Sequence, residues 1–304
     1  MEDFIDSLWR EVERQPEVLA EFARRRLPKA HSGSIFVGAG DSFAAAQMGF
    51  FATGCSHIAL DPYVLASDPK VAEEREVYFV SVSGRTKSNA RAASRVKPYA
   101  KRTIALTAVP GAPLTGLTDS LVRLPVAYMP RTPGMLSFTL SALAVMKISG
   151  AGGRCDFGKA FEEAGKKDIA FAQGSGTTYF LGNWLAFPVS LYAAAKTYEI
   201  LGAKAHAEFL EEFNHLELFS LDRLDTVNSF SCFDPSGLAA KLSGILGRRS
   251  PVIRHWGRSP LEKVFHAIFQ VQLSVLDEGR RRGIRAPRFL TRRDSLAASD
   301  RMIY

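Results

Sequence analysis

The sequence predicts an α/β protein made of two similar halves, each with a mostly parallel sheet that helices cover on both faces. Short apolar runs, rich in β-branched and aromatic residues, alternate along the chain with longer helix-periodic segments. This alternation is typical of parallel sheets. The same order of elements restarts after a glycine- and charge-rich connection at 150–168. With 304 residues, the chain is long enough for about two domains.

The first expected element is an amphipathic helix within residues 1–27 that packs on the core. Its apolar residues recur at helical spacing and form one stripe. They are Phe4, Ile5, Leu8, Trp9 and Val12.

The first half then follows in order. A strand at 34–40 ends in glycines, and a helix begins after it with Asp41 and Ser42 at the expected N-cap. Further strands are expected within 76–84, 102–119 and 120–126, before a helix at 137–150.

The second half repeats this order. Residues 177–206 are expected to form a strand, a glycine-containing turn and a long helix. Weaker strand patterns at 225–235 and 250–257 precede a strong helix at 260–283, which Gly283 ends. We therefore expect three parts: the helix at 1–27, a first domain at 28–152, and a second domain at 153–304 that carries the C-terminal tail.

The composition is that of an ordinary globular protein, with 46% hydrophobic and 23% charged residues. No apolar run approaches the ~18 residues needed to span a bilayer, and no leader is expected at the start. The cysteines at 55, 155 and 232 are scattered and lack the CxxC spacing. This argues against a disulfide framework and a zinc site, and it favours a cytoplasmic location.

The net charge of +8 raises the possibility of a nucleic-acid partner. Much of the surplus lies at 278–293, without an aromatic-interleaved RNA motif or a zinc finger. Binding of an anionic small molecule is the simpler expectation, and nucleic acid remains a minor alternative.

Three hydroxyls and a glycine are crowded at the end of one expected strand: Ser81, Ser83, Gly84 and Thr86. A helix N-terminus offers free N–H groups to an anion, and glycine lets the anion approach the backbone. The segment GAGDS at 38–42 is the equivalent turn one strand earlier, where Ser42 adds a donor. The simpler alternative is that these side chains only cap the next helix. Neither turn matches a P-loop or a complete dinucleotide fingerprint, so a nucleotide cofactor is not expected.

These turns resemble those of the sugar isomerase (SIS) domain family. The family has a G-x-G-x-S turn, an S-x-S-G-x-T phosphate loop and a following strand-loop segment, which the residues at 38–42, 80–86 and 104–126 resemble. The segment at 132–143 is similar to a helix start at the sugar site, where Gly134 and Ser137 match. The likeness covers nearly the whole chain as two SIS domains. It is closest to the isomerase half of glutamine–fructose-6-phosphate aminotransferase, and more distant from archaeal phosphoglucose/phosphomannose isomerases.

The resemblance implies two flavodoxin-like αβα sandwiches, each with a five-stranded sheet, and no cofactor. It also implies a homodimer with shared sites and a sugar phosphate as the small-molecule partner. The glutaminase half of the aminotransferase is not expected here, because the chain begins directly in the isomerase-like helix. The substrate-binding residues carried over by the resemblance are Asp41, Ser42, Ser81, Val82, Ser83, Gly84, Thr86, Ser137 and Arg292.

The catalytic roles come from the same resemblance. Glu199 is the base that moves a proton between C1 and C2, Lys196 is a substrate-orienting cation, and His215 assists ring opening. By spacing alone, Lys196 and Glu199 are equally well a surface ion pair on one helix face. Alternative bases in the same carboxylate-rich segment are Glu208, Glu211 and Glu212.

The chain departs from the family at three places. Leu216 and Glu217 replace the Gly-Pro that follows the family histidine, Arg85 replaces an acidic residue, and Val82 replaces a polar one. These differences affect the identity of the sugar more than phosphate binding. The expected function is aldose–ketose isomerisation of a hexose 6-phosphate or amino-hexose 6-phosphate, of the fructose 6-phosphate or glucosamine 6-phosphate type. The alternatives are a glucosamine-6-phosphate deaminase of the SIS type and a non-catalytic sugar-phosphate sensor.

Overall fold

The computed structural model describes residues 4–166 and 168–303, except for the side chain of residue 293. These residues form two compact units. The first-half unit consists of residues 21–153 and 292–303, and the second-half unit consists of residues 4–20 and 154–291.

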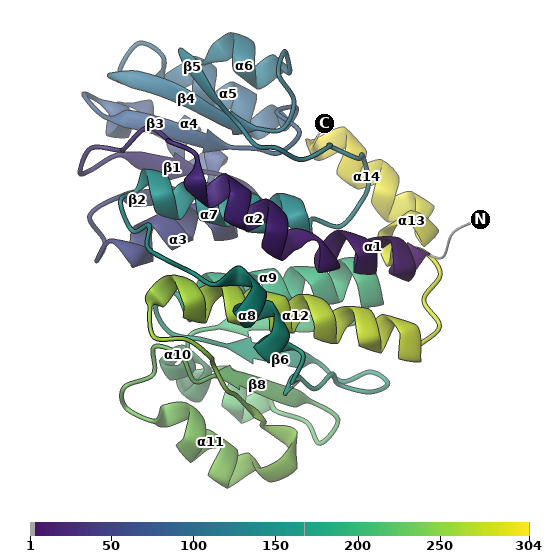
Figure 1. Cartoon of the computed structure of the whole chain (residues 1–304). Coiled ribbons are helices and arrows are strands. Elements are labelled where there is room, and N and C mark those ends of the chain that lie inside the picture. Colours follow the sequence, from purple (N-terminus) through teal and green to yellow (C-terminus); the bar gives the residue numbers. More distant parts are fainter. Residues whose placement is uncertain (1–3, 167, 304) are drawn as a thin grey trace. The chain divides into compact units, whose positions relative to one another are not determined.

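The first-half unit contains a five-stranded sheet of order β2-β1-β3-β4-β5, in which all neighbours are parallel (Figure 1). Its strands are β1 (Ile35–Val37), β2 (Ile58–Leu60), β3 (Glu76–Val80), β4 (Arg102–Thr107) and β5 (Ser120–Arg123). Its helices are α3 (Asp41–Ala52), α4 (Pro62–Ser67), η1 (Pro69–Ala72), α5 (Lys87–Val96), α6 (Pro113–Leu117), α7 (Leu136–Ile148) and α14 (Arg293–Ile303).

Both faces of this sheet are covered, as expected for parallel strands. On one face, Val37 and Phe79 pack into a core with residues of α4, η1, α5 and α6. On the other face, Phe36 stacks on Tyr78 and lies close to Gly49 of α3. The expected αβα arrangement with five parallel strands is confirmed for this half.

The second-half unit contains a four-stranded parallel sheet of order β7-β6-β8-β9. Its strands are β6 (Thr178–Leu181), β7 (Ala205–Glu208), β8 (Thr226–Phe230) and β9 (Val252–Ile253). Its helices are α1 (Phe4–Glu13), α8 (Phe157–Ala164), α9 (Ala186–Lys196), the π-turn η2 (Thr197–Leu201), α10 (Leu210–His215), η3 (Glu217–Ser220), α11 (Leu238–Leu246), η4 (Gly247–Arg249), α12 (Pro260–Arg281) and α13 (Arg288–Thr291).

The fifth strand expected in the second half is absent from the described residues. In the first half, residues 108–135 separate β4 from α7 and leave room for β5. In the second half, only residues 254–259 separate β9 from α12. This polar, glycine-containing connection leads directly to the capping box of α12, in which Ser259 and Glu262 satisfy each other's backbone N–H groups.

The single helix expected within 1–27 is two helices, α1 and α2 (Gln15–Arg24). The break falls at Arg14, just before Pro16. Proline lacks an N–H and its ring clashes with the carbonyl four residues earlier, so it is tolerated only near a helix start. Of the residues in the expected apolar stripe of α1, Ile5, Leu8 and Val12 are buried, whereas Phe4 and Trp9 are half-buried.

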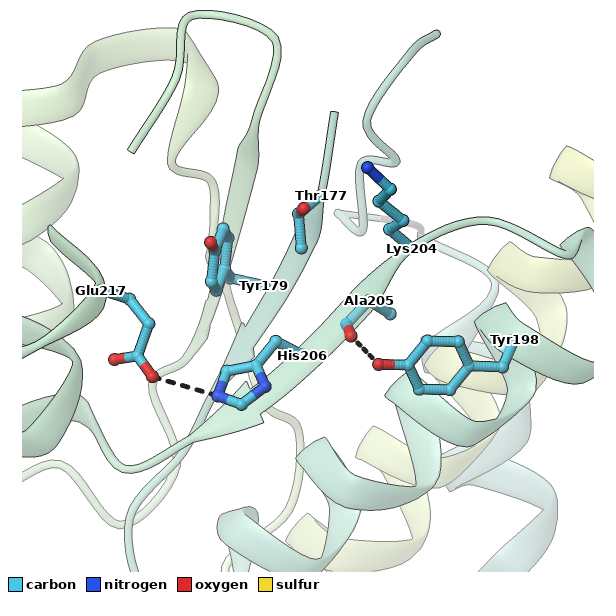
Figure 2. A pocket seen from close by; sticks show the side chains of 7 residues that line it. All are labelled: Thr177, Tyr179, Tyr198, Lys204, Ala205, His206 and Glu217. Atoms are coloured by element: carbon cyan, nitrogen blue, oxygen red, sulfur yellow. Dashed lines mark hydrogen bonds and ion pairs between the residues drawn. The ribbon is translucent and has the colours of Figure 1, made fainter. Parts of the chain in front are cut away.

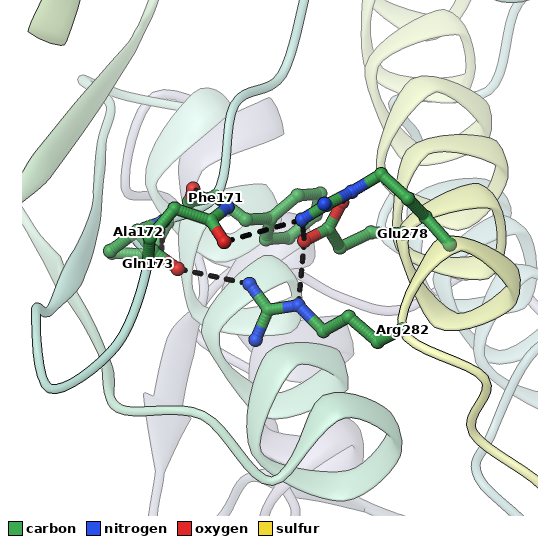
Figure 3. Close-up of polar contacts among 7 residues, drawn as sticks. Phe171, Ala172, Gln173, Glu278 and Arg282 are labelled. Atoms are coloured by element: carbon green, nitrogen blue, oxygen red, sulfur yellow. Dashed lines mark hydrogen bonds and ion pairs between the residues drawn. The ribbon is translucent and has the colours of Figure 1, made fainter.

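The basic end of α12 is tied to the segment before β6 (Figure 3). Arg282 donates to Glu278 Oε1 at 2.6 Å and to the Ala172 carbonyl at 2.9 Å. Arg281 donates to both carboxylate oxygens of Glu278 and to Gln173 Oε1. Part of the basic surplus at 278–293 is therefore used in structural ion pairs. None of the described helices is long and apolar enough to cross a bilayer.

Candidate functional site

The predicted phosphate segment at 81–86 forms the turn between β3 and α5. Ser81 and Ser83 are only 3% and 6% exposed. Ser81 Oγ lies 3.4 Å from Thr86 Oγ1, and Ser83 Oγ accepts a hydrogen bond from the Arg85 N–H at 3.2 Å. The turn lies at the carboxyl edge of an interior strand, where open α/β sheets bind ligands.

The hydroxyls in this turn do not act as ordinary helix caps. Thr86 is the N-cap residue of α5, with φ −60° and ψ 117°, yet no side chain accepts a capping hydrogen bond there. The first turn of α5 also contains no acidic side chain. Its leading N–H groups and the positive end of the helix dipole are therefore open to an anion, which is the chemistry that suits a phosphate.

Glycine is required at position 84 for two reasons. Its φ of 61° lies in the left-handed region, and a Cβ would be 2.6 Å from the Ala112 Cβ and 3.1 Å from Thr107 Oγ1. The turn is held from the same side, since Leu114 N–H donates to the Gly84 carbonyl and Thr107 Oγ1 donates to the Val82 carbonyl. Val82 is thus fixed through its backbone, and its side chain is half-buried.

The GAGDS turn follows β1, the neighbour of β3, and leads into α3. Gly40 is the N-cap residue of α3 with φ 57°, and no side chain caps this helix either. A Cβ at Gly38 would lie 2.4 Å from the backbone of Ser42, so the first glycine allows the tight turn. Two uncapped helix starts with nearby hydroxyls therefore follow two adjacent strands.

Asp41 and Ser137 lie together around Gly134. A Cβ at Gly134 would be 2.7 Å from Asp41 Oδ2 and 3.2 Å from Ser137 Oγ. Ser137 is in the first turn of α7, whose N-cap is Met135. A carboxylate near this helix start is electrostatically favourable, so Asp41 can hold α3 and α7 together as well as face a ligand.

Lys196 and Glu199 form an ion pair that is not a surface pair. The Lys196 side chain is fully buried and that of Glu199 is 35% exposed. The Lys196 ammonium also lies 5.2 Å from the centroid of the Tyr192 ring, and Gln272 donates to the Tyr192 hydroxyl at 3.0 Å. Since an unpaired buried ammonium is costly, this environment fixes Lys196 beside the partly exposed carboxylate.

The expected placement of this pair on one regular helix is wrong in detail. Lys196 is the last residue of α9, and Glu199 lies in the π-turn η2. Isolated π-turns inside helices are frequent at functional sites. Gly202 ends the turn with φ 61°, and a Cβ there would lie 2.0 Å from Arg288 Cγ, so α13 packs against the end of this turn.

His215 is not joined to this pair. Its Nε2 lies 3.1 Å from Glu211 Oε1, and both side chains are more than two-thirds exposed. Among the described residues, no contact links His215 to Lys196 or Glu199. The other carboxylates proposed as bases are Glu208, which is half-buried on β7, and Glu212, which is exposed on α10.

Arg292 is exposed between α13 and α14, and its carbonyl accepts the Leu296 N–H. The residues that follow pack in the first-half unit, where Asp300 pairs with Arg131 and the Arg301 carbonyl accepts from Lys87. Arg292 is thus the first residue of the C-terminal part of the first-half unit. The predicted site residues themselves belong to separate units: the phosphate turns to the first-half unit, and Lys196, Glu199 and His215 to the second-half unit.

One cluster was missed from sequence. His206 lies beside Glu208 and Glu217, and it lines a pocket of about 380 Å³ with Glu217. The signal that could have revealed it is the His-Ala-Glu order of 206–208, which places two possible ligands on one face of a strand.

Comparisons with known proteins support the fold. No protein-family model matches the sequence, and no curated protein matches it. Among solved structures, the chain resembles a glucosamine-6-phosphate deaminase from Thermotoga maritima, with a TM-score of 0.72, 20% identity, and coverage of 91% of this chain and 95% of the other.

Two further structures are similar over most of their length. A tagatose-6-phosphate ketose/aldose isomerase from Escherichia coli has a TM-score of 0.69 and 15% identity, with 91% of this chain and 94% of the other covered. The C-terminal domain of glucosamine-fructose-6-phosphate aminotransferase from Francisella tularensis has a TM-score of 0.62 and 16% identity, with 90% and 94% covered. The α/β fold with parallel sheets of five and four strands is therefore the fold of phosphosugar-enzyme structures.

Proposed function

We propose that the chain is a sugar-phosphate aldose–ketose isomerase that acts on a hexose 6-phosphate or an amino-hexose 6-phosphate. The observation that carries the proposal is the turn at 81–86, where two hydroxyls meet at the start of α5 without capping it. Hydroxyls and N–H groups at the carboxyl edge of a parallel sheet support phosphate binding there. The net charge of +8 favours an anionic substrate.

In this proposal, Ser81, Ser83 and Thr86 hold the phosphate ester together with the N–H groups of α5, and Ser42 adds a donor from the neighbouring turn. Gly84 keeps the backbone open to the ester. Asp41 and Ser137 face sugar hydroxyls, and Arg292 closes over the sugar from the C-terminal segment. Val82 and Arg85 contribute to the choice of sugar.

Proton transfer is assigned to Glu199. Its carboxylate removes the proton from C2 of the open-chain aldose, the electrons of that bond form the C1=C2 bond of the enediol, and O1 takes up a proton as its carbonyl bond breaks. The O2 proton then leaves as the C2 carbonyl forms, and Glu199 returns its proton to C1. The aldose and the ketose contain the same atoms and electrons, so the reaction needs no redox partner or cofactor. Lys196 holds the carboxylate in one orientation and stabilises the developing oxyanion. His215 assists opening of the sugar ring.

The proposal includes a homodimer with shared sites, located in the cytoplasm. The exposure of His215 supports this, because an exposed histidine is accessible to the site of a second copy. Analytical ultracentrifugation tests this point, and a monomer at micromolar concentration would contradict it.

A second reaction is favoured by one specific likeness. A deaminase that acts on glucosamine 6-phosphate must also open the ring and move the C2 proton to C1, and the T. maritima structure with a TM-score of 0.72 is such an enzyme by name. The same residues would then serve a substrate whose C2 imine is hydrolysed by water, with ammonia as the leaving group.

A thermal-shift panel followed by turnover assays tests these possibilities. The panel contains fructose, glucose, mannose and glucosamine 6-phosphates, with unphosphorylated fructose as the control. We expect stabilisation by at least one phosphate ester and none by fructose, followed by turnover of the same ester. Ammonia release from glucosamine 6-phosphate would identify the deaminase, stabilisation without turnover a sensor, and no response to any ester would overturn the proposal.

A further inference from the structure

The strongest feature outside the proposed active site is a group of three possible metal ligands in the second-half unit: His206, Glu208 and Glu217. One ligand atom from each lies within 4.8 Å of the others. Figure 2 shows His206 on its strand with Glu217 pointing toward it from the other side. This group is called the His-Glu-Glu cluster below.

The strand geometry brings the first two ligands together. His206 and Glu208 are two residues apart on β7, so they project from the same face of the sheet. In the register with β6 they lie opposite Tyr179 and Leu181, which pack in the core with residues of α10 and α11. Because β7 is the edge strand, no further strand covers this region, and the cluster remains accessible.

The third ligand comes from η3, which follows α10. Glu217 Oε1 lies 3.1 Å from His206 Nε2, and Glu208 Oε2 lies 3.8 Å from the same nitrogen. Metal–nitrogen and metal–oxygen bonds of about 2.0–2.2 Å place neighbouring ligand atoms roughly 3–3.5 Å apart. The His206–Glu217 separation of 3.1 Å therefore fits a single tetrahedral ion, and the His206–Glu208 separation of 3.8 Å is slightly longer.

A buried carboxylate oxygen supplies an independent reason for a cation here. Glu217 Oε2 is inaccessible to solvent and has no hydrogen-bond partner among the described residues. Burying an unsatisfied anionic oxygen is costly, and such an orphan commonly marks the place of an ion or water. Lys204 lines the adjoining pocket.

The pocket provides the open side of the site. It has a volume of about 380 Å³, and its walls combine hydroxyl, amine, imidazole and carboxylate groups. They come from Thr177, Tyr179, Tyr198, Lys204, Ala205, His206 and Glu217 (Figure 2). Tyr198 is fixed there by its hydrogen bond to the Ala205 carbonyl.

We propose that the His-Glu-Glu cluster binds a divalent transition-metal ion, with Zn²⁺ as the best match. One imidazole and two carboxylates suit Zn²⁺ or Co²⁺ better than Mg²⁺ or Ca²⁺, which prefer oxygen ligands alone. Three protein ligands leave a fourth position toward the pocket, where water or a small anion beside Lys204 completes the coordination. This site is separate from the proton transfer assigned to Glu199, and it does not depend on the proposed function.

Co²⁺ titration of the full-length, tag-free chain tests the proposal, because tetrahedral Co²⁺ has strong visible absorption. A Cys55→Ser background removes the one exposed thiol. We expect saturation at one equivalent, and Zn²⁺ should displace the bound Co²⁺. His206→Ala and Glu217→Gln should each weaken binding by more than the roughly 10- to 100-fold that loss of an outer partner costs.

The matched control is His215→Ala, because His215 and Glu211 form another His–Glu pair at 3.1 Å in the same unit. This variant should retain the full Co²⁺ affinity. Glu208→Gln removes the other ligand on β7 and should also weaken Co²⁺ binding, so the test does not depend on one variant that fails to fold. Far-UV circular dichroism checks that each variant is folded. The proposal is overturned if the parent chain binds no Co²⁺, or if His215→Ala weakens binding as much as His206→Ala.

Discussion

At the scale of single residues, the account depends on the difference between two Lys–Glu pairs with the same spacing. Lys159 and Glu162 lie three apart on α8, and their side chains are 43% and 70% exposed. Lys196 and Glu199 have the same separation, but the lysine is fully buried and its partner lies in a π-turn. Exposed pairs contribute little to stability, whereas a buried cation beside a reachable carboxylate is suited to chemistry.

Replacement of Glu199 by Gln tests its assignment as the base. The amide keeps the size of the side chain but cannot accept the proton, so kcat should fall by about 10²- to 10⁴-fold. Binding of the sugar phosphate, measured by calorimetry, should change little. Glu162→Gln is the control and should leave both quantities unchanged. Wild-type turnover in Glu199→Gln would remove this residue from the mechanism.

At the scale of secondary-structure elements, α5 and α12 differ in how they use the hydroxyl residue at the N-cap, which is Thr86 in α5 and Ser259 in α12. Ser259 accepts the Glu262 N–H in a capping box, whereas the Thr86 side chain makes no capping hydrogen bond to α5. The Ser259 hydroxyl stabilises its helix, and the Thr86 hydroxyl remains available to a ligand.

Ser259→Ala should therefore affect the stability of the fold, and Thr86→Val should affect ligand binding. Ser259→Ala should lower the free energy of unfolding by about 1 kcal/mol through loss of the cap. Thr86→Val should leave stability nearly unchanged and weaken phosphate-ester binding by roughly tenfold, the loss of about one hydrogen bond to a charged group. Urea unfolding and calorimetry measure the two effects. A destabilised Thr86→Val with normal ligand binding would restore the simple capping role.

The elements that were predictable from sequence are those with strong local patterns. The strands before the glycine turns and the helix at 260–283 appear where the sequence places them. The strand β7 was hidden, because Ala205–Glu208 contains no β-branched or aromatic residue. Its conformation comes from pairing with β6, which is a tertiary effect. The sequence pattern extended the preceding helix through it instead.

Within the candidate site, the phosphate turn was easier to predict from sequence than the surroundings of Lys196. The hydroxyls at 81–86 are adjacent in sequence, so a short pattern reveals them. The burial of Lys196 depends on Tyr192 and on Gln272 of a distant helix, and sequence spacing alone cannot distinguish this lysine from Lys159. Glu217 lies beside His206 only because η3 folds back toward β7. The periodicity of the sequence does not predict this contact.

At the scale of the whole molecule, one buried histidine links stability to pH. His266 is 3% exposed and accepts the Trp256 N–H at Nδ1, at 3.3 Å. Burial lowers its pKa to about 4, although the hydrogen bond with the Glu163 backbone acts in the opposite direction. Between pH 6.5 and 4 the unfolded chain therefore binds more protons than the folded one, so acid destabilises the fold.

The free energy of unfolding should therefore decrease as the pH is lowered. The contribution of His266 is fully present above about pH 6.5 and is lost as the pH falls toward 4, at roughly 1.4 kcal/mol per pH unit. The tryptophans at 9, 184 and 256 all belong to the second-half unit, so their fluorescence in urea reports this unfolding. His266→Gln should show a shallower loss of stability from pH 7 to 5. An unchanged slope would show that His266 is not the group that titrates.

The central claim is that the chain moves a proton between C1 and C2 of a sugar 6-phosphate. Proton NMR in D₂O tests it most directly, because an enediol held by an accessible base exchanges its proton with solvent. With fructose 6-phosphate or glucosamine 6-phosphate as substrate, we predict deuterium at C1 of the fructose 6-phosphate pool, and none with Glu199→Gln. If the wild-type chain binds these esters but leaves every C1 and C2 proton in place, the assignment of an isomerase or deaminase is contradicted.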